Sequence, residues 1–199
     1  MNLDRPAAVI LAGGNANRLG GADKPLLEVG GAPILAGVIA ALGADVSAIA
    51  ISANGDPTRF AAFGLPVLPD GPFTGHGPLA GLLAGLEWAA LIGARTLLTV
   101  PGDTPFIPTG LASALAPPPA CAASNGRVHH LVALWPVECR DELRRMLSSP
   151  GSRAVVRFTE HIGTQALDFP VRGRDPFLNI NTPEDLETAR ALTDKQGET

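Results

Sequence analysis

The sequence predicts an α/β fold with a mostly parallel central sheet. Four short apolar runs have the length and composition of buried strands: 7–11, 46–52, 65–68 and 96–100. Segments with helical periodicity or helix start signals separate these runs, at 33–42, 56–63 and 79–91. Strands that alternate with helices in this way are typical of βαβ units, whose strands lie parallel and are covered on both faces.

Local signals set the bounds of the first elements. The first strand ends at Gly13-Gly14 and leads into a polar, glycine-rich stretch, 15–28, for which we predict a long functional loop. Pro33 stands in the first turn of its helix. Asp56 is expected to cap the next helix, with Pro57 at the first helical position.

The pattern changes after the proline run at 117–119. Downstream we predict a strand, two helices and a last strand, at 131–135, 138–147, 153–161 and 177–180. The closing helix has a strong start signal. Thr182 is its cap, Pro183 is its first residue, and Asp185 stands at capping-box spacing.

Bulk properties limit the class of protein. A chain of 199 residues suffices for one domain with a sizeable core, and 46% hydrophobic against 17% charged residues argues against disorder. No apolar run reaches the roughly 18 residues that suggest a membrane span, and the first residues lack the pattern of a secretion signal. A net charge of −4 without a basic stripe argues against a nucleic-acid partner. Cys121 and Cys139 have no CxxC spacing, so we expect free thiols in a cytoplasmic protein.

The glycine-rich segment from Leu11 to Pro25 is the first candidate site. Glycines that follow a buried strand let backbone N–H groups approach phosphates closely. The guanidinium group of Arg18 can donate two parallel hydrogen bonds to phosphate oxygens, and the ammonium group of Lys24 can act there as a point charge. Only two of the 15 basic residues are lysines, which suggests that an ammonium group is needed here. The segment lacks the Walker A and GxGxxG patterns, and a solvated surface turn is the alternative.

Acidic and amide side chains supply further candidates. Asp103 directly follows the strand at 96–100, at the carboxyl end where parallel sheets bind ligands, and its carboxylate can hold Mg²⁺ against triphosphate oxygens. Asp70 stands ahead of the segment Gly77-Pro-Leu-Ala-Gly81. Asn179 and Asn181 are expected on one face of an extended segment. Taken one at a time, these residues are also explained by turns and caps.

Together and in this order, the motifs resemble the molybdenum cofactor guanylyltransferase family. The resemblance spans about 7–192 and rests on Leu11-Ala-Gly-Gly14 with Arg18, Gly20-Gly21, Asp23-Lys24, Gly77-Pro-Leu-Ala-Gly81, Asp103-Thr-Pro105 and Asn179-Ile-Asn-Thr-Pro183. It implies a Rossmann-like three-layer α/β/α fold with a mostly parallel central sheet. Within one domain over 1–199, it implies a nucleotide-binding half at about 7–115 and a pterin-side half at about 120–192.

The resemblance also implies an activity. Members transfer GMP from GTP to molybdopterin-bound molybdenum, release pyrophosphate and form the molybdopterin guanine dinucleotide cofactor. Catalytic roles fall to Arg18, Lys24 and Asp103, with Mg²⁺ held by Asp103. We expect a monomer that makes transient contacts with proteins that deliver and accept the cofactor.

The resemblance assigns substrate contacts as well. Expected GTP contacts are Leu11, Ala12, Gly13, Lys24, Asp70 and Asp103, and expected residues on the pterin side are Gly81, Asn179 and Asn181. Where the family often has Asn-Ala-Asn after the second strand, this chain has Ser52-Ala-Asn54. The nucleotide contact at that point therefore falls on Ser52 or on Asn54.

Some features and functions stay open at this stage. His129-His130 resembles a His-Pro segment of the family, although two adjacent histidines are more often exposed strand residues than ligands. Within the superfamily, the alternative functions are a cytidylyltransferase acting on molybdopterin and a sugar-phosphate nucleotidyltransferase. Outside it, the alternatives are a non-catalytic nucleotide-sensing module and a hydrolase.

Overall fold

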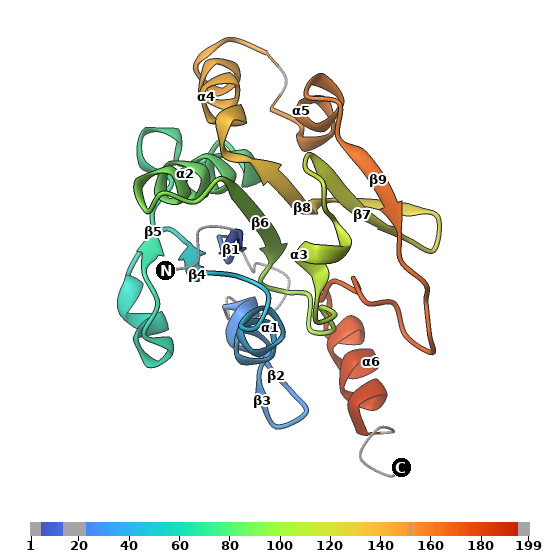
Figure 1. Ribbon diagram of the computed structural model, residues 1–199. Helices are drawn as coiled ribbons and strands as arrows, with labels where there is room; N and C mark the ends of the chain where they lie inside the picture. Colours follow the sequence, from blue (N-terminus) through green and yellow to red (C-terminus); the bar gives the residue numbers. More distant parts are fainter. Residues whose placement is uncertain (1–4, 14–22, 152, 195–199) are drawn as a thin grey trace.

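In the computed structural model, which describes residues 5–13, 23–151 and 153–194, a seven-stranded sheet carries helices on both faces, as Figure 1 shows. Across the sheet the strands are, in order, β5 (Val67–Leu68), β4 (Ala48–Ser52), β1 (Ala7–Leu11), β6 (Thr96–Pro101), β8 (Arg127–Pro136), β7 (Ala120–Ser124) and β9 (Gln165–Asp168). The predicted three-layer α/β/α fold is confirmed.

β1 lies within the parallel part of the sheet. It pairs in parallel with β4 on one side and with β6 on the other, and β4 pairs in parallel with β5. β8 is antiparallel to both of its neighbours, β6 and β7, whereas β9 is parallel to β7. The sheet is therefore mixed but mostly parallel, as the sequence predicted.

The helices cover the two faces in two groups (Figure 1). One face carries α1 (Ile34–Leu42), α3 (Leu111–Ala114) and α6 (Pro183–Asp194), and the other carries α2 (Pro78–Leu91), α4 (Arg140–Ser148) and α5 (Val155–His161). Ala8 and Ile10 of β1 belong to the first core, and Ala7 and Val9 belong to the second. Burial on both faces explains why β1 is a continuous apolar run. No helix in the described part of the chain is long and apolar enough to cross a membrane.

β6 and β8 separate before the end of β6. Their pairing ends at Thr99 and Ala133, although β6 continues to Pro101. The indole N–H of the buried Trp135 donates to Thr99 Oγ1 at 2.8 Å, and this bond fixes the two strands to each other just before they part. The sheet is consequently open on the β8 side of the carboxyl end of β6.

The second half of the chain differs from the prediction in its strands. The segment 177–180 is not a strand, because Phe177 and Ile180 are buried beneath the sheet without pairing with it. β7 and β9 were not predicted. β7 consists of small residues with little strand propensity, so its sequence lacks the usual signal. β8 is twice as long as its predicted counterpart, and a short hairpin, β2 (Glu28–Val29) with β3 (Ala32–Pro33), follows the predicted functional loop.

Both predicted helix caps are confirmed. The Asp56 carboxylate accepts from Thr58 N at 2.9 Å at the start of the 3₁₀ helix Pro57–Phe63. At the start of α6, Asp185 N donates to Thr182 Oγ1 at 3.1 Å. In return, Asp185 Oδ2 accepts from Thr182 N at 2.9 Å and from Asn181 N at 2.8 Å. The capping box therefore fixes the backbone of Asn181 as well as the first turn of α6.

The two cysteines are buried free thiols. Burial raises the pKa of the Cys139 thiol to about 12, and it also raises the pKa of Cys121. Neither thiol has the lowered pKa that a nucleophilic or redox-active cysteine requires.

We predict that Asp185→Ala lowers the free energy of unfolding by about 1 kcal/mol, the usual cost of a lost helix cap. The hydrogen bond from Asn181 N, followed by those from Thr182, lowers the pKa of Asp185 below its ordinary value of 3.8. A lowered pKa means that the stabilisation is present at neutral pH and is lost as the pH falls through the folded-state pKa. Urea unfolding at pH 7 and at successively lower pH measures both effects. Glu187→Ala, at an exposed position of α6, should cost less than about 0.5 kcal/mol, and equal losses in the two variants would contradict the cap.

Candidate active site

A cavity of about 180 Å³ lies at the carboxyl ends of β1 and β6. Leu11, at the end of β1, lines it together with Ala12 and Gly13, which follow that strand. Pro101, at the end of β6, lines it together with Asp103, which follows β6. The chain runs from β1 outward to β4 and β5 and then returns to β6 on the other side of β1. The cavity is therefore at the topological switch point, where open α/β sheets bind ligands.

Lys24 connects this cavity to two distant segments. Its Nζ lies 2.7 Å from Asn181 Oδ1 and 3.4 Å from Asp103 Oδ2. The side chains of Lys24 and Asp103 are only 18% and 20% exposed. The ion pair is thus largely shielded from water, and it remains at the wall of a cavity that a ligand can enter.

Gly102 makes this approach possible. A Cβ atom at Gly102 would lie 3.0 Å from Pro25 Cγ, which is tighter than ordinary van der Waals contact. Pro25 is buried in the 3₁₀ helix Lys24–Leu26, directly after the lysine. Gly102 N also donates to Leu11 O at 2.9 Å. The glycine lets the lysine segment pack against the end of β6 while β1 and β6 stay bonded to each other.

Burial raises the pKa of the Asp103 carboxyl, and the Lys24 ammonium beside it acts in the opposite direction. A shielded carboxylate of this kind is stabilised by a cation, because Coulombic attraction is stronger away from water. Mg²⁺ prefers oxygen ligands and is usually held by one or two carboxylates together with substrate phosphates. The Asp103 carboxylate fits that donor set, whereas the amide oxygens of Asn179 and Asn181 already accept from Thr104 and Lys24. Among the described residues, no group of three or more His, Cys, Asp or Glu side chains could hold a metal unaided.

Asn54 and Asp70 form a second polar group, where β4 and β5 end. Asn54 Nδ2 donates to Asp70 Oδ2 at 2.7 Å, and Asp70 N donates to Asn54 Oδ1 at 3.0 Å. Arg59 donates to the Asn54 carbonyl oxygen at 2.8 Å. Its Nε also lies 3.2 Å from Asp23 Oδ2, an ion pair without hydrogen-bond geometry. Arg59 thereby connects the ends of β4 and β5 to the segment that contains Lys24.

Ser52 and Gly81 lie behind the cavity, between α2 and the sheet. Ser52 is 2% exposed. A Cβ atom at Gly81 would lie 2.4 Å from Ser52 Oγ and 3.2 Å from Leu11 Cδ2. Close packing of α2 on β1 and β4 therefore explains the glycine without any ligand. Of the two alternatives after the second strand, Asn54 is the half-buried side chain beside Asp70, whereas Ser52 is the buried one.

The segment before α6 is attached to the residues that follow β6. The buried Thr104 donates through Oγ1 to Asn179 Oδ1 at 2.7 Å, and Ile180 N donates to the backbone oxygen of Asp103 at 2.9 Å. The capping box then holds the backbone of Asn181 so that its side chain meets Lys24. Two asparagines that are distant in the sequence from Asp103 are in this way brought to its cavity.

Comparison with known proteins decides the family. The MobA-like NTP transferase domain matches residues 8–165. A molybdenum cofactor guanylyltransferase of Acidiphilium cryptum is 55% identical over 184 residues, which are 92% of this chain and 93% of that protein. One from Rhodopseudomonas palustris is 48% identical over 197 residues, covering 94% of this chain and 92% of that protein. This chain belongs to the molybdenum cofactor guanylyltransferase family. It is therefore a nucleotidyltransferase.

Solved structures agree with this nucleotidyltransferase in fold. A nucleotidyl transferase from Methanothermobacter thermautotroptrophicus has a TM-score of 0.75 at 20% identity and covers 97% of this chain and 99% of its own. The molybdopterin-guanine dinucleotide biosynthesis protein A of Archaeoglobus fulgidus has a TM-score of 0.71 at 21% identity, with 95% and 99% covered. At these identities the similarity supports the fold alone.

The structure of this nucleotidyltransferase separates the predicted site residues into three groups. The first group lines the cavity or contacts Lys24. The residues that line it are Leu11, Ala12, Gly13, Lys24, Asp103 and Asn179, and Asn181 accepts a hydrogen bond from Lys24. Asn54 and Asp70 form the second group, and Ser52 and Gly81 form the third, which is buried. Arg18, together with Gly14, Gly20 and Gly21, lies outside the described residues. Sequence reasoning missed Arg59 and the cavity-lining Leu131, because neither stands in a motif and both are recognisable only by their contacts.

We predict that Gly81→Ala lowers the free energy of unfolding by about 1–3 kcal/mol, the usual cost of overpacking a core. Ser52→Ala removes the Oγ atom that the new Cβ would meet, so the double variant should recover part of that loss. Urea unfolding of both single variants and the double variant gives the coupling energy, and strictly additive losses would contradict the contact. The matched control is Gly37→Ala, in α1, where a Cβ has nothing within 4 Å. It should be neutral or stabilising, because alanine is the better helix former.

Proposed function

We propose that this enzyme transfers GMP from GTP to molybdopterin-bound molybdenum, releases pyrophosphate and forms the molybdopterin guanine dinucleotide cofactor. The observation that carries the proposal is the cluster of Lys24, Asp103 and Asn181 at the switch point of the sheet. An ammonium and a shielded carboxylate side by side suit the binding of a triphosphate with its divalent cation. The names of relatives at 48–55% identity support the same reaction.

The two polar groups suggest how GTP lies. We place the triphosphate against the cavity formed by Leu11, Ala12 and Gly13, within reach of Lys24. The guanine then extends toward Asn54 and Asp70. The hydrogen-bond donors and acceptors on the edge of the guanine ring can pair with the Asn54 amide and the Asp70 carboxylate. The second substrate approaches from the opposite side, where Asn179 lines the cavity.

The reaction is a displacement at phosphorus. A terminal phosphate oxygen of molybdopterin attacks the α-phosphorus of GTP, the bond from that phosphorus to the bridging oxygen breaks, and pyrophosphate leaves with the electron pair. Asp103 would hold Mg²⁺, which when bound acts as a Lewis acid on the phosphate oxygens. Lys24 exchanges its 3.4 Å contact with Asp103 for the phosphates and stabilises their developing charge, while Asn181 orients its ammonium. Arg18 is proposed from the family resemblance to add a second positive charge.

The wider setting follows from the same function. We propose a cytoplasmic monomer that meets the proteins delivering and accepting the cofactor only transiently. A non-catalytic nucleotide-sensing module would bind the phosphates with the same residues but would not turn GTP over. Release of pyrophosphate therefore distinguishes an enzyme from a sensing module.

We predict that Asp103→Asn keeps the fold and loses Mg²⁺-dependent turnover by about 10²-fold or more, the usual effect of removing a transition-state charge stabiliser. Pyrophosphate release with GTP, Mg²⁺ and molybdopterin-bound molybdenum measures this loss. Asp168→Asn, at an exposed aspartate that ends β9, is the matched control and should keep wild-type turnover. Turnover near the wild-type value in Asp103→Asn would contradict the metal assignment.

Lys24 allows an independent test of the triphosphate site. Lys24→Ala should remain folded, although the unfolding midpoint falls because the shielded Asp103 carboxylate loses its cation. The folded variant should show sharply weaker GTP binding in calorimetry and slower pyrophosphate release. Lys24→Arg should restore only part of the activity, because a planar guanidinium does not replace a compact ammonium. Lys195→Ala, in the polar C-terminal tail, removes the other lysine and should have no effect. Unchanged GTP affinity in Lys24→Ala would remove the lysine from the site.

Base selectivity separates guanylyl transfer from cytidylyl transfer. With Mg²⁺ present, GTP should raise the thermal unfolding midpoint of the enzyme, because a ligand that binds only the folded state stabilises it. CTP and UTP at the same concentration should produce little or no rise. A larger rise with CTP would favour the cytidylyltransferase alternative.

A further inference from the structure

Three consecutive residues, Asp23, Lys24 and Pro25, contact three different parts of the protein. Lys24 meets the polar residues around the cavity, and Pro25 lies against Gly102, just after β6. Asp23 instead contacts Arg59, in the 3₁₀ helix that follows β4. The proposed function uses Lys24 but leaves the contact between Asp23 and Arg59 unexplained.

The carboxylate of Asp23 does not cap the helix that it precedes. Asp23 is the N-cap residue of the 3₁₀ helix Lys24–Leu26, a position that favours aspartate because its carboxylate can accept from backbone N–H groups of the first turn. No such bond forms. Instead, Asp23 Oδ2 lies 3.2 Å from Arg59 Nε, and within the described part of the chain the carboxylate has no other partner. The side chain therefore serves a contact with another segment.

The guanidinium group of Arg59 is fixed by contacts near the end of β4. Its Nη2 donates to the Asn54 carbonyl oxygen at 2.8 Å. Gly55, with a φ of +82°, leaves room for it, because a Cβ atom there would lie 3.2 Å from Arg59 Nη1. The guanidinium carbon also lies 4.8 Å from the ring centroid of the buried Phe60, an arrangement that attracts a cation. Arg59 thus offers Asp23 a partner whose own position is set.

The ion pair between Asp23 and Arg59 is better suited to placing a segment than to stabilising the fold. The two side chains are 35% and 27% exposed, and ion pairs near the surface contribute little to stability. Arg59 Nε is itself buried and has no hydrogen-bond partner among the described residues, because the contact with Asp23 lacks hydrogen-bond geometry. The contact therefore has a donor available with which it can become closer.

Arg59 lies between the two parts of the proposed GTP site. Asn54, whose carbonyl oxygen it contacts, forms with Asp70 the pair to which we assign the guanine. Asp23, its other partner, directly precedes Lys24, to which we assign the triphosphate. Arg59 is not among the described residues that line the cavity. One side chain therefore connects the two subsites from outside the cavity.

We propose that Arg59 is a positioning residue for GTP and that it acts through Asp23 on the position of the Lys24 ammonium. The contact fixes the ammonium at the distance from the guanine-binding pair that a single nucleotide requires. Binding of the guanine and binding of the phosphates then favour each other, because each finds the other subsite in place. When GTP is bound, the Asp23 carboxylate accepts a hydrogen bond from Arg59 Nε. The inference rests on the proposed function.

Ligands that carry only one part of GTP test the proposal. With Mg²⁺ present, calorimetry gives the dissociation constant of GTP, and competition with GTP gives those of guanosine and of inorganic triphosphate. Arg59→Ala should weaken GTP binding about tenfold, a usual size for coupling between two sites. Its affinities for guanosine and for inorganic triphosphate should stay near the wild-type values, because neither ligand spans both subsites.

Asp23 supplies a second variant that removes the same contact. Asp23→Ala leaves the bond from Arg59 to Asn54 intact, and it should weaken GTP binding as much as Arg59→Ala does, which tests the proposal even if the arginine variant does not fold. The double variant should bind GTP no more weakly than either single variant, because all three lack the same interaction. Arg59→Lys should restore part of the affinity, because an ammonium can pair with Asp23 but lacks the fork that meets both partners.

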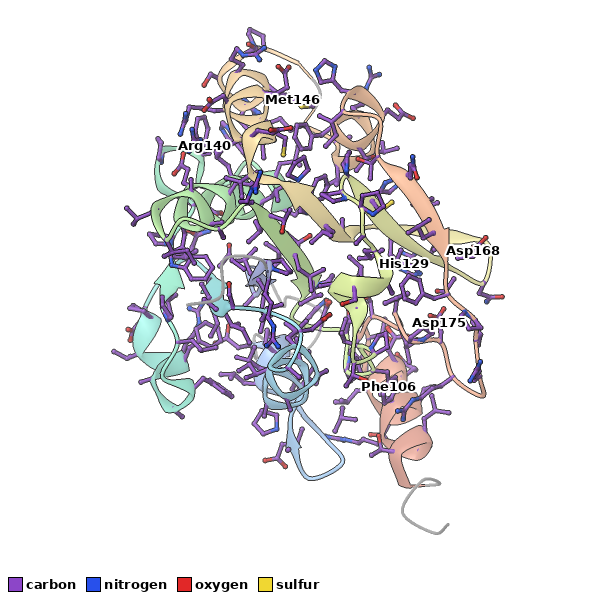
Figure 2. The ribbon with its side chains drawn as sticks, viewed as in Figure 1. Phe106, His129, Arg140, Met146, Asp168 and Asp175 are labelled. Carbon is purple, nitrogen blue, oxygen red and sulfur yellow. The ribbon has the colours of Figure 1, made fainter. Side chains whose placement is uncertain are left out.

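Arg140→Ala is the matched control. Arg140 Nε lies 3.1 Å from Asp141 Oδ1, and the arginine side chain is 32% exposed, so the ion pair is similar to that of Arg59 but joins neighbours in one helix. Figure 2 shows Arg140 at the start of α4. That helix follows the end of β8, which pairs with the start of β6 and thus lies at the opposite edge of the sheet from the cavity. The variant should bind all three ligands as the wild type does.

Several results would overturn the proposal. One is wild-type GTP affinity in a folded Arg59→Ala or Asp23→Ala variant. Another is an equal loss of affinity for guanosine or for inorganic triphosphate, which would assign Arg59 to one subsite alone. Losses that multiply in the double variant would show that the two residues act separately. A wild-type enzyme that binds GTP no more tightly than inorganic triphosphate would contradict the proposed function itself, and it differs from the other results because the wild type also fails.

Discussion

The arrangement of the site depends on the need of the Lys24 ammonium group for polar partners. A cation that is only 18% exposed needs partners, and Lys24 finds them in Asp103 and Asn181, which are 79 and 157 residues further along the chain. The end of β6 and the start of α6 must therefore meet at one point. Gly102 leaves room for the lysine segment, and the capping box holds the backbone of Asn181.

The sheet around this point is asymmetric, and the asymmetry suits an enzyme with two different substrates. On one side of β1 the strands are parallel and end in the Asn54–Asp70 pair. On the other side β6 parts from the antiparallel β8, and a bulge in β8 opens a second cavity next to the first. Under the proposed function, nucleotide and pterin approach Lys24 and Asp103 from opposite sides. The in-line displacement itself requires the attacking phosphate oxygen to lie opposite the leaving pyrophosphate at the α-phosphorus.

The sequence predicted the features that depend on interactions between residues close together in the chain. Buried strands, caps and the glycines after β1 leave local patterns, so the parallel half of the sheet, the start of α6 and the positions of Lys24 and Asp103 were predictable. The second half of the chain was harder to predict, because its structure depends on pairing between strands that are distant in the sequence. β7 is a run of small residues, and Phe177 and Ile180 have a strand-like apolar pattern although they belong to a buried loop. Contacts between distant residues, such as Arg59 with Asp23, leave no pattern in either segment.

A crystal structure of the enzyme with GTP and Mg²⁺ is the most direct test of the central claim, that Lys24 and Asp103 form the phosphate and metal centre. We predict that the triphosphate lies over the ends of β1 and β6, with the ammonium of Lys24 on phosphate oxygens and the metal on Asp103. The guanine should lie beside Asn54 and Asp70. A nucleotide seated in the cavity between β6 and β8, or a metal held away from Asp103, would contradict this claim.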